Sequence, residues 1–252
     1  MNKLPPEVPD FIRSAIIIDP RDIWGNLVTA GLGDVISALT PTKRFDKRGE
    51  VFFWDSFEHG LGSWFTTLLG TLASAEVSSA YALFGGFSVK MVGGSDGGLS
   101  AKIYHRQYYP SATKLGLEFA FTVVSGADNI EWQITIYTGT RVIYGLVKYD
   151  QNSTKLQYWS SAGAWADLQT GVNLSTLTGV FHVGKLVIDP ATEKYVRFLL
   201  GKNEYDMGAL GCEAVDDTTA PYMLVSAKVV SDSGQNATIY VDNVVLTQNE
   251  PA

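Results

Sequence analysis

The chain has 252 residues, of which 46% are hydrophobic and 18% are charged, and its net charge is −7. This length holds one large all-β domain or two small ones. The acidic balance excludes nucleic acid as a partner, because binding phosphates requires clustered lysine and arginine. The low charge and the 25 glycines favour tightly turned strands, and the single cysteine, Cys212, excludes an intrachain disulfide.

The N-terminal residues show no targeting signal. The start, MNKLPPEVPDF, lacks the apolar core of a signal peptide, and its prolines would break a helical one. No apolar run approaches the roughly 20 residues that span a membrane. We therefore expect synthesis in a reducing cytoplasm, with no signal peptide and no membrane partner.

Residues 1–50 differ from the rest and predict an N-terminal arm. Over residues 22–39 apolar side chains recur at three- and four-residue steps, which is typical of one face of a helix. Three glycines weaken this short helix, so we expect it to need a partner surface. The charged stretch 43–50 is predicted to be a solvated linker. The expected assembly anchors of the arm are Trp24, Leu27, Val28, Val35 and Ile36.

From Val51 onward the hydrophobic period changes to two, and short β-rich runs alternate with clusters of Gly, Asn, Asp and Ser. The pattern predicts an all-β fold, an antiparallel jelly-roll β-sandwich over residues 51–248, followed by a short tail at 249–252. We expect strands near residues 51–57, 86–92, 115–124, 130–137, 141–149, 155–159, 180–188, 195–200, 222–230 and 237–247.

Three segments carry a family resemblance. They are the opening run 54–64, the strand, turn, strand, turn unit 181–206, and the closing strand 239–246, with 86–90 as a weaker companion. Together they resemble the concanavalin A-like and carbohydrate-binding-module jelly rolls, and the second unit resembles laminin-G-like sandwiches. The resemblance implies the fold rather than the function, because this fold hosts enzymes, lectins and scaffolds.

The resemblance also implies a metal site. Jelly rolls of this kind often hold a calcium ion between the first and last strands, and Glu58 and Asp242 match those positions. Calcium takes about six to eight oxygen ligands, so carbonyls and waters would supply the rest. In the alternative interpretation Glu58 faces solvent and Asp242 caps a turn. A structural calcium is the only cofactor that we expect.

Residues for catalysis are not arranged as glycoside hydrolysis requires. Two carboxyl groups must lie about 5–9.5 Å apart, and no Glu-x-Asp-x-x-Glu pattern is present. Glu131 stands alone on its predicted strand, which is typical of a solvent-facing residue. The histidines lie in unrelated segments, and no nucleophile elbow precedes a helix. We therefore expect a protein that is not an enzyme.

Two aromatic clusters are candidates for glycan binding, because aromatic faces pack against sugar rings while polar neighbours bind hydroxyls. In the alternative interpretation the aromatic side chains fill the core, and Trp159 pairs with Trp165 across a hairpin. The candidate residues are Tyr104, Arg106, Tyr108 and Tyr109 in the first cluster and Tyr158, Trp159 and Trp165 in the second.

The predicted function combines these features. A jelly roll that is made in the cytoplasm, carries an arm and lacks a catalytic set is typical of a virion component, such as a capsid-decoration, fibre or tail protein. Its expected partners are copies of itself or other virion proteins, bound through the arm. The alternative is a glycan-binding lectin or carbohydrate-binding module, with polysaccharide as the partner. A glycoside hydrolase or lyase is the minor alternative.

Overall fold

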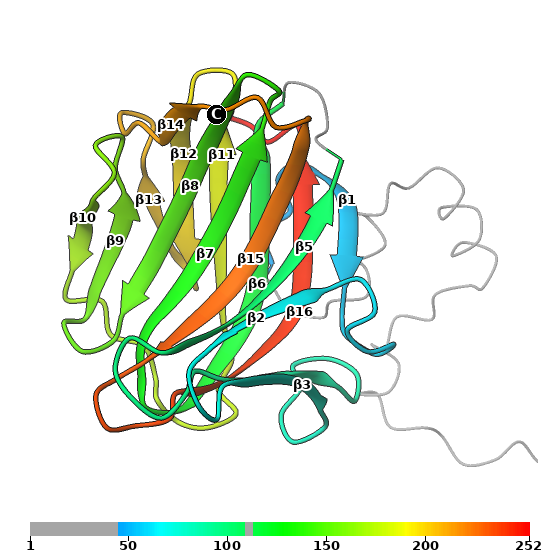
Figure 1. Ribbon diagram of the computed structural model, residues 1–252, viewed down its shortest axis with the longest axis vertical. Helices are drawn as coiled ribbons and strands as arrows, with labels where there is room; N and C mark the ends of the chain where they lie inside the picture. Colours follow the sequence, from blue (N-terminus) through cyan, green and yellow to red (C-terminus); the bar gives the residue numbers. More distant parts are fainter. Residues whose placement is uncertain (1–44, 109–112) are drawn as a thin grey trace, which may run out of the picture.

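The computed structural model describes residues 45–108 and 113–252, and every regular element in them is a β-strand (Figure 1). The strands form two antiparallel sheets stacked face to face, which confirms the predicted all-β sandwich. The expected helix and its anchors, as well as Tyr109, lie outside the described residues. No helix in the described ranges is long and apolar enough to cross a membrane.

The sheet that lies behind in Figure 1 is called the back sheet, and β1 pairs with its central strand β16. In spatial order its strands are β13 (Asn203–Asp206), β12 (Lys194–Leu200), β11 (His182–Asp189), β6 (Leu115–Ser125), β16 (Thr238–Gln248), β4 (Ser88–Val92) and β3 (Ser74–Ser78), with β1 (Glu50–Asp55) beside β16.

The sheet nearer the viewer in Figure 1 is called the front sheet. β14 pairs with the first residues of β8, Arg141 to Tyr144. In spatial order its strands are β10 (Trp165–Thr170), β9 (Lys155–Trp159), β8 (Arg141–Asp150), β7 (Ala127–Tyr137), β15 (Tyr222–Ser231), β5 (Ser100–Gln107) and β2 (Phe65–Leu69), with β14 (Glu213–Asp216) beside β8.

The core between the sheets is built around Trp132 of β7. Its ring stacks on Phe119 of β6, with 4.8 Å between ring centroids, and its Nε1 donates a hydrogen bond to the carbonyl of Gly184 at 3.1 Å. A Cβ at Gly184 would lie 2.4 Å from the indole, so only glycine lets β11 approach this closely. The largest buried side chain of the front sheet therefore fixes the spacing of the two layers.

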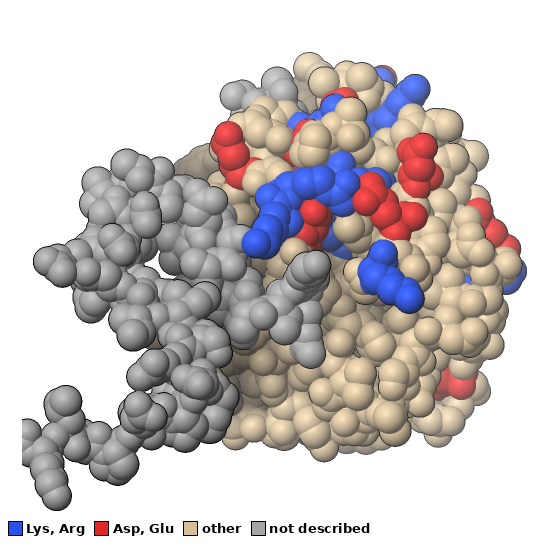
Figure 2. All heavy atoms as spheres, turned by 180° about the vertical axis from the view of Figure 1, so that it is seen from behind, with Lys and Arg blue, Asp and Glu red and all other residues tan. Residues whose placement is uncertain are grey.

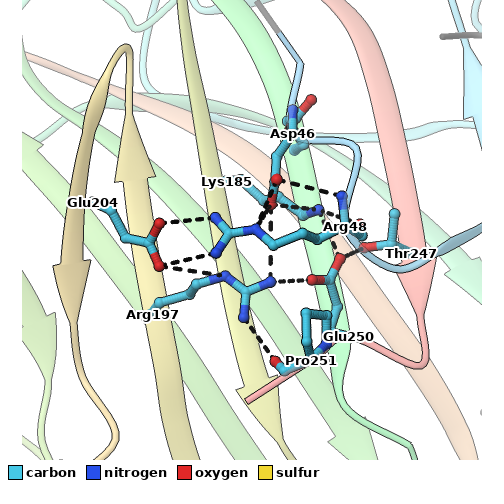
Figure 3. Close-up of polar contacts among 9 residues, drawn as sticks. Asp46, Arg48, Lys185, Arg197, Glu204, Thr247, Glu250 and Pro251 are labelled. Atoms are coloured by element: carbon cyan, nitrogen blue, oxygen red, sulfur yellow. Dashed lines mark hydrogen bonds and ion pairs between the residues drawn. The ribbon is translucent and has the colours of Figure 1, made fainter.

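The junction between the arm and the sandwich is an ion cluster on the outer face of the back sheet (Figures 2 and 3). Lys185, whose side chain is 1% exposed, lies 2.6 Å from Glu250 and 3.2 Å from Asp46. Arg197 binds Glu250, and Arg48 binds Asp46 at 2.9 Å. The predicted solvated linker is therefore wrong for Asp46 and Arg48, because buried cations of β11 and β12 draw this segment onto the sheet.

One carboxyl group beside the cluster has an unusual environment. Glu118 of β6 is 2% exposed and lines a cavity of about 210 Å³ together with Asp46 and Lys185. One carboxyl oxygen accepts the Asp46 backbone N–H at 3.1 Å, and among the described residues the other oxygen has no hydrogen-bond partner. Burial raises the pKa of Glu118 to about 8.

Candidate functional site

The outer side of the front sheet, called the front face, gathers polar and aromatic side chains. On β5, Ala101 and Ile103 enter the core, so Lys102, Tyr104 and Arg106 point the other way. The same alternation applies to the neighbouring strands β15, β7 and β8. Their outward positions are Leu224, Ser226 and Lys228 on β15, Glu131, Gln133 and Thr135 on β7, and Tyr144, Leu146 and Lys148 on β8.

One line of these residues crosses the whole sheet and is called the aromatic row. It starts with an aromatic pair on β2 and β5, passes through polar and aliphatic residues, and ends with a second aromatic pair on β9 and β10. In order its members are Phe65, Tyr104, Ser226, Gln133 and Leu146, which pair from strand to strand, and then Trp159 and Trp165, which pair with each other. Between Leu146 and Trp159, one position beyond the paired residues of β8 and β9, the Tyr195 hydroxyl bonds both backbones.

The two ends of the aromatic row are both preassembled aromatic pairs. Phe65 and Tyr104 are stacked, with centroids 5.3 Å apart, while Trp159 and Trp165 meet edge to face at 5.3 Å. The Trp159 Nε1 donates to a carboxyl oxygen of Glu213 at 2.6 Å, which fixes the orientation of that indole. These rings are therefore held in place before any ligand arrives.

The middle of the aromatic row carries hydrogen-bonding groups. The hydroxyl of Ser226 donates to the Gln133 carbonyl oxygen at 3.0 Å, and the Gln133 amide nitrogen donates to Thr135 Oγ1 at 2.8 Å. This chain of bonds fixes the amide of Gln133 in one orientation. Ser226 and Thr135 are 3% and 2% exposed, so the half-buried Gln133 amide is the group of this chain of bonds that a sugar hydroxyl can reach.

A second line, the charged row, runs parallel to the aromatic row. It places Lys102, Lys228, Glu131 and Lys148 on four adjacent strands. Lys228 pairs with Glu131 at 3.0 Å, and Glu131 is 7% exposed, so the prediction that this carboxylate faces solvent is wrong. Burial and the neighbouring Lys228 lower the pKa of Lys102.

The predicted glycan-binding residues fall into three groups. Tyr104 and Arg106 of the first cluster and Trp159 and Trp165 of the second lie on the front face. Tyr158 instead packs inward against Tyr195, with centroids 5.7 Å apart, as the core interpretation predicted. Tyr108 follows the end of β5 and is 91% exposed, and Tyr109 lies outside the described residues.

Several front-face residues were not among the candidates from sequence. Gln133 and Lys148 occupy outward positions of the predicted strands 130–137 and 141–149, whereas Lys102 lies on β5, where no strand was predicted. The alternation within each strand was the available signal. It could not show which outward residues become neighbours, because that depends on the register between strands.

The two residues predicted to bind calcium contact the same loop of the back sheet. Asp242 accepts backbone N–H groups of Leu83 at 2.7 Å and Phe84 at 3.2 Å, and Glu58 accepts that of Gly86 at 2.9 Å. Burial, with a contribution from the charge of Glu58, raises the pKa of Asp242 to about 6. The two carboxylates repel each other, so their negative charge would suit a bound cation. The described residues, however, contain no group of three or more His, Cys, Asp or Glu side chains that could hold a metal ion.

Comparison with known proteins shows likeness in structure only. No family model matches the chain, and no curated protein matches it. Among solved structures, a glucuronan lyase from the fungus Trichoderma reesei has a TM-score of 0.52 and 13% identity, covering 80% of this chain and 100% of its own. The cellulose-induced protein Cip1 has a TM-score of 0.51 and 14% identity, covering 77% and 96%.

Peanut lectin is also similar, with a TM-score of 0.50 and 11% identity, covering 79% of this chain and 97% of the lectin. These identities are low, so the likeness shows the fold alone. It supports the predicted fold, an antiparallel β-sandwich of the kind these proteins share.

Proposed function

We propose that this protein binds glycans on the front face and does not cleave them. The observation that carries the proposal is the aromatic row, in which preassembled aromatic pairs flank the Gln133 amide, which Ser226 and Thr135 hold in one orientation. Aromatic rings pack on the apolar faces of sugar rings, and amides and hydroxyls bind the sugar hydroxyls. The row supplies both kinds of contact on one surface.

The length of the aromatic row favours a polymer over a single sugar. The row crosses seven strands, which corresponds to roughly 29 Å at about 4.8 Å per strand. A chain of several sugar units laid across the strands would contact the ring pair Phe65 and Tyr104 at one end and the pair Trp159 and Trp165 at the other. The likeness to a protein named as a lectin supports glycan binding in general, whatever the length of the glycan.

The enzyme alternative has less support from the geometry of the charged row. Glu131 is bound to Lys228 at 3.0 Å, and the next acid on that row, Asp167, lies three strands away, about 14 Å at the usual strand spacing. That separation exceeds the roughly 5–9.5 Å that hydrolysis needs between two carboxyl groups. Asp150 is nearer, one strand from Glu131 and diagonal to it, but its carboxyl group accepts the Ser153 backbone N–H at 2.8 Å in the following turn. We expect no turnover of any bound polysaccharide. Product formation that is lost in Glu131→Gln would contradict this.

Assembly through the N-terminal arm, in a virion or elsewhere, remains a prediction about residues outside the described ranges. The front face and the arm junction lie on opposite sheets, at Tyr104 and Asp46 respectively. Glycan binding and assembly would therefore use separate surfaces.

The proposal is tested by affinity electrophoresis of the full chain through gels containing neutral or acidic polysaccharides. We expect retardation by at least one polysaccharide, and loss of that retardation in Trp165→Ala and Tyr104→Ala. Tyr108→Ala is the matched control, because this exposed tyrosine lies off the aromatic row. Retardation by no polysaccharide, or equal retardation of all variants, would refute the proposal.

A further inference from the structure

Three cations of the front face have no anionic partner. Lys102, Arg106 and Lys148 form no ion pair with any carboxylate among the residues that the structure describes. Lys228 is different, because it is bound to Glu131 at 3.0 Å. The chain has a net charge of −7, and acids lie toward the β10 side of the front face (Asp167, Glu213) and at the end of β8 (Asp150), so the unpaired cations make the middle of this face locally positive.

Each of these cations lies beside an aromatic ring. The Arg106 guanidinium is 3.9 Å from the centre of the Tyr222 ring, and the Lys148 ammonium is 4.7 Å from that of Trp165. Lys102 lies 5.6 Å from the Tyr104 ring. Such contacts hold the cations in place without neutralising them. Each therefore combines a ring surface with a free positive charge.

The middle of the front face has a clear charge excess. On β5, β15, β7 and β8, the outward positions of three successive cross-strand lines include the cations Lys102, Arg106, Lys148 and Lys228 and the single carboxylate Glu131. Lys102 is half-buried and close to Lys228, so the negative charge of a bound anion would offset both the repulsion between the two ammonium groups and the cost of burying Lys102.

We propose that the ligand is an acidic polysaccharide that bears carboxylate or sulfate groups. This inference rests on the proposed glycan-binding function. The anionic groups of the ligand bind Lys102, Arg106 and Lys148, while its sugar rings pack on the aromatic row. Lys102 and Lys148 are three strands apart on the charged row, about 14 Å at the usual strand spacing. They are therefore placed to contact acidic groups on different sugar units of one chain.

The test compares matched polymers by isothermal titration calorimetry with the full chain. Polygalacturonate is compared with its methyl ester, and dextran sulfate with dextran, so that charge is the variable within each pair. The variant replaces Lys102, Arg106 and Lys148 by Gln. The control replaces the exposed lysines of the other surfaces, Lys47, Lys194 and Lys202, by Gln, which changes the net charge equally.

We expect the acidic member of at least one pair to bind more tightly than its neutral counterpart, and less tightly as salt is raised. The front-face variant should weaken that binding on the order of a thousandfold, since each of the three lost charged contacts costs about tenfold, while the control stays near wild type. The pair that shows the effect identifies carboxylate or sulfate as the group bound.

Two results would overturn the inference. Equal binding of acidic and neutral members, unchanged in the front-face variant, would remove the acidic ligand but leave the proposed glycan binding intact. Equal weakening in the variant and the control would show attraction to overall charge rather than to this face. Binding of no polymer here or in the electrophoresis would refute the proposed function itself.

Discussion

Lys148 and Trp165 meet across the front sheet, with the ammonium 4.7 Å from the centre of the indole ring. Lys148 pairs with Gln157 of β9, and β9 in turn pairs with the strand that carries Trp165. The hairpin of β9 and β10 therefore brings an aromatic ring over a cation of β8. The contact joins the charged row to the aromatic row at one end of the front face.

The packing of Gly184 against Trp132 predicts an effect on stability. Gly184→Ala places a Cβ 2.4 Å from the indole, so the two sheets must shift apart or the ring must leave its position. We expect a loss of roughly 1–3 kcal/mol of unfolding free energy, as for other overpacked cores. Gly62→Ala is the control, because nothing lies within 4 Å of its added Cβ. Urea denaturation of both variants measures the difference, and equal midpoints would contradict the packing described.

The ion cluster predicts where the arm can be cut. Removal of residues 1–44 should leave a cooperatively melting domain, because the ion pairs of Asp46 and Arg48 remain. Removal of residues 1–48 deletes both and leaves Lys185 with Glu250 as its only carboxylate partner within 4 Å in the described chain. We expect this second truncation to cost roughly 1.5–3 kcal/mol, the usual value for a charged hydrogen bond. Thermal melts that place the loss at the first truncation instead would show that the arm belongs to the core.

Glu118 predicts a pH dependence of stability. Its pKa is raised to about 8 in the folded chain from an ordinary value of 4.5, so the folded state binds the proton more tightly. Stability from this group is complete below pH 4.5 and falls as the pH rises through about 8. Glu118→Gln should lose less stability than the wild type over this range, with the exposed Glu76→Gln as control. Parallel stability curves for Glu118→Gln and the wild type would show that Glu118 ionises normally.

Calcium should raise the melting temperature if it binds at Glu58 and Asp242. A ligand that binds only the folded state stabilises it by mass action. Because the pKa of Asp242 is raised to about 6, binding should strengthen as the pH rises through that value and the carboxyl group loses its proton. Asp242→Asn should abolish the shift. An identical melt in calcium and in EDTA would remove the metal from this account.

Much of the fold could be predicted from alternation within single strands. The predicted strand at 141–149 corresponds to β8, whose apolar residues face the core at every second position. The strand β5, Ser100–Gln107, was not predicted, because its inward residues are the small Ala101, Ile103 and the polar His105, which give a weak apolar alternation. The strand β2, Phe65–Leu69, is exposed at every position and has no buried side to detect.

The candidate site was predictable in its aromatic residues but not in its charges. Trp159 and Trp165 flank a turn, and they pair across the predicted hairpin. Lys102 and Lys148 are 46 positions apart in the chain and share the charged row only through the intervening β15 and β7. Such a relationship depends on strand order and register, which local sequence patterns do not encode.

The most direct test of the central claim is hydroxyl-radical footprinting of the full chain with and without a bound polysaccharide. If the front face is the binding surface, the oxidation of Tyr104, Trp159 and Trp165 should fall when the ligand is added. Tyr108 and the exposed Trp54 of the back sheet should be oxidised as before. Protection of Trp54 or of the ion-cluster face, with Tyr104 and Trp165 unchanged, would contradict the claim.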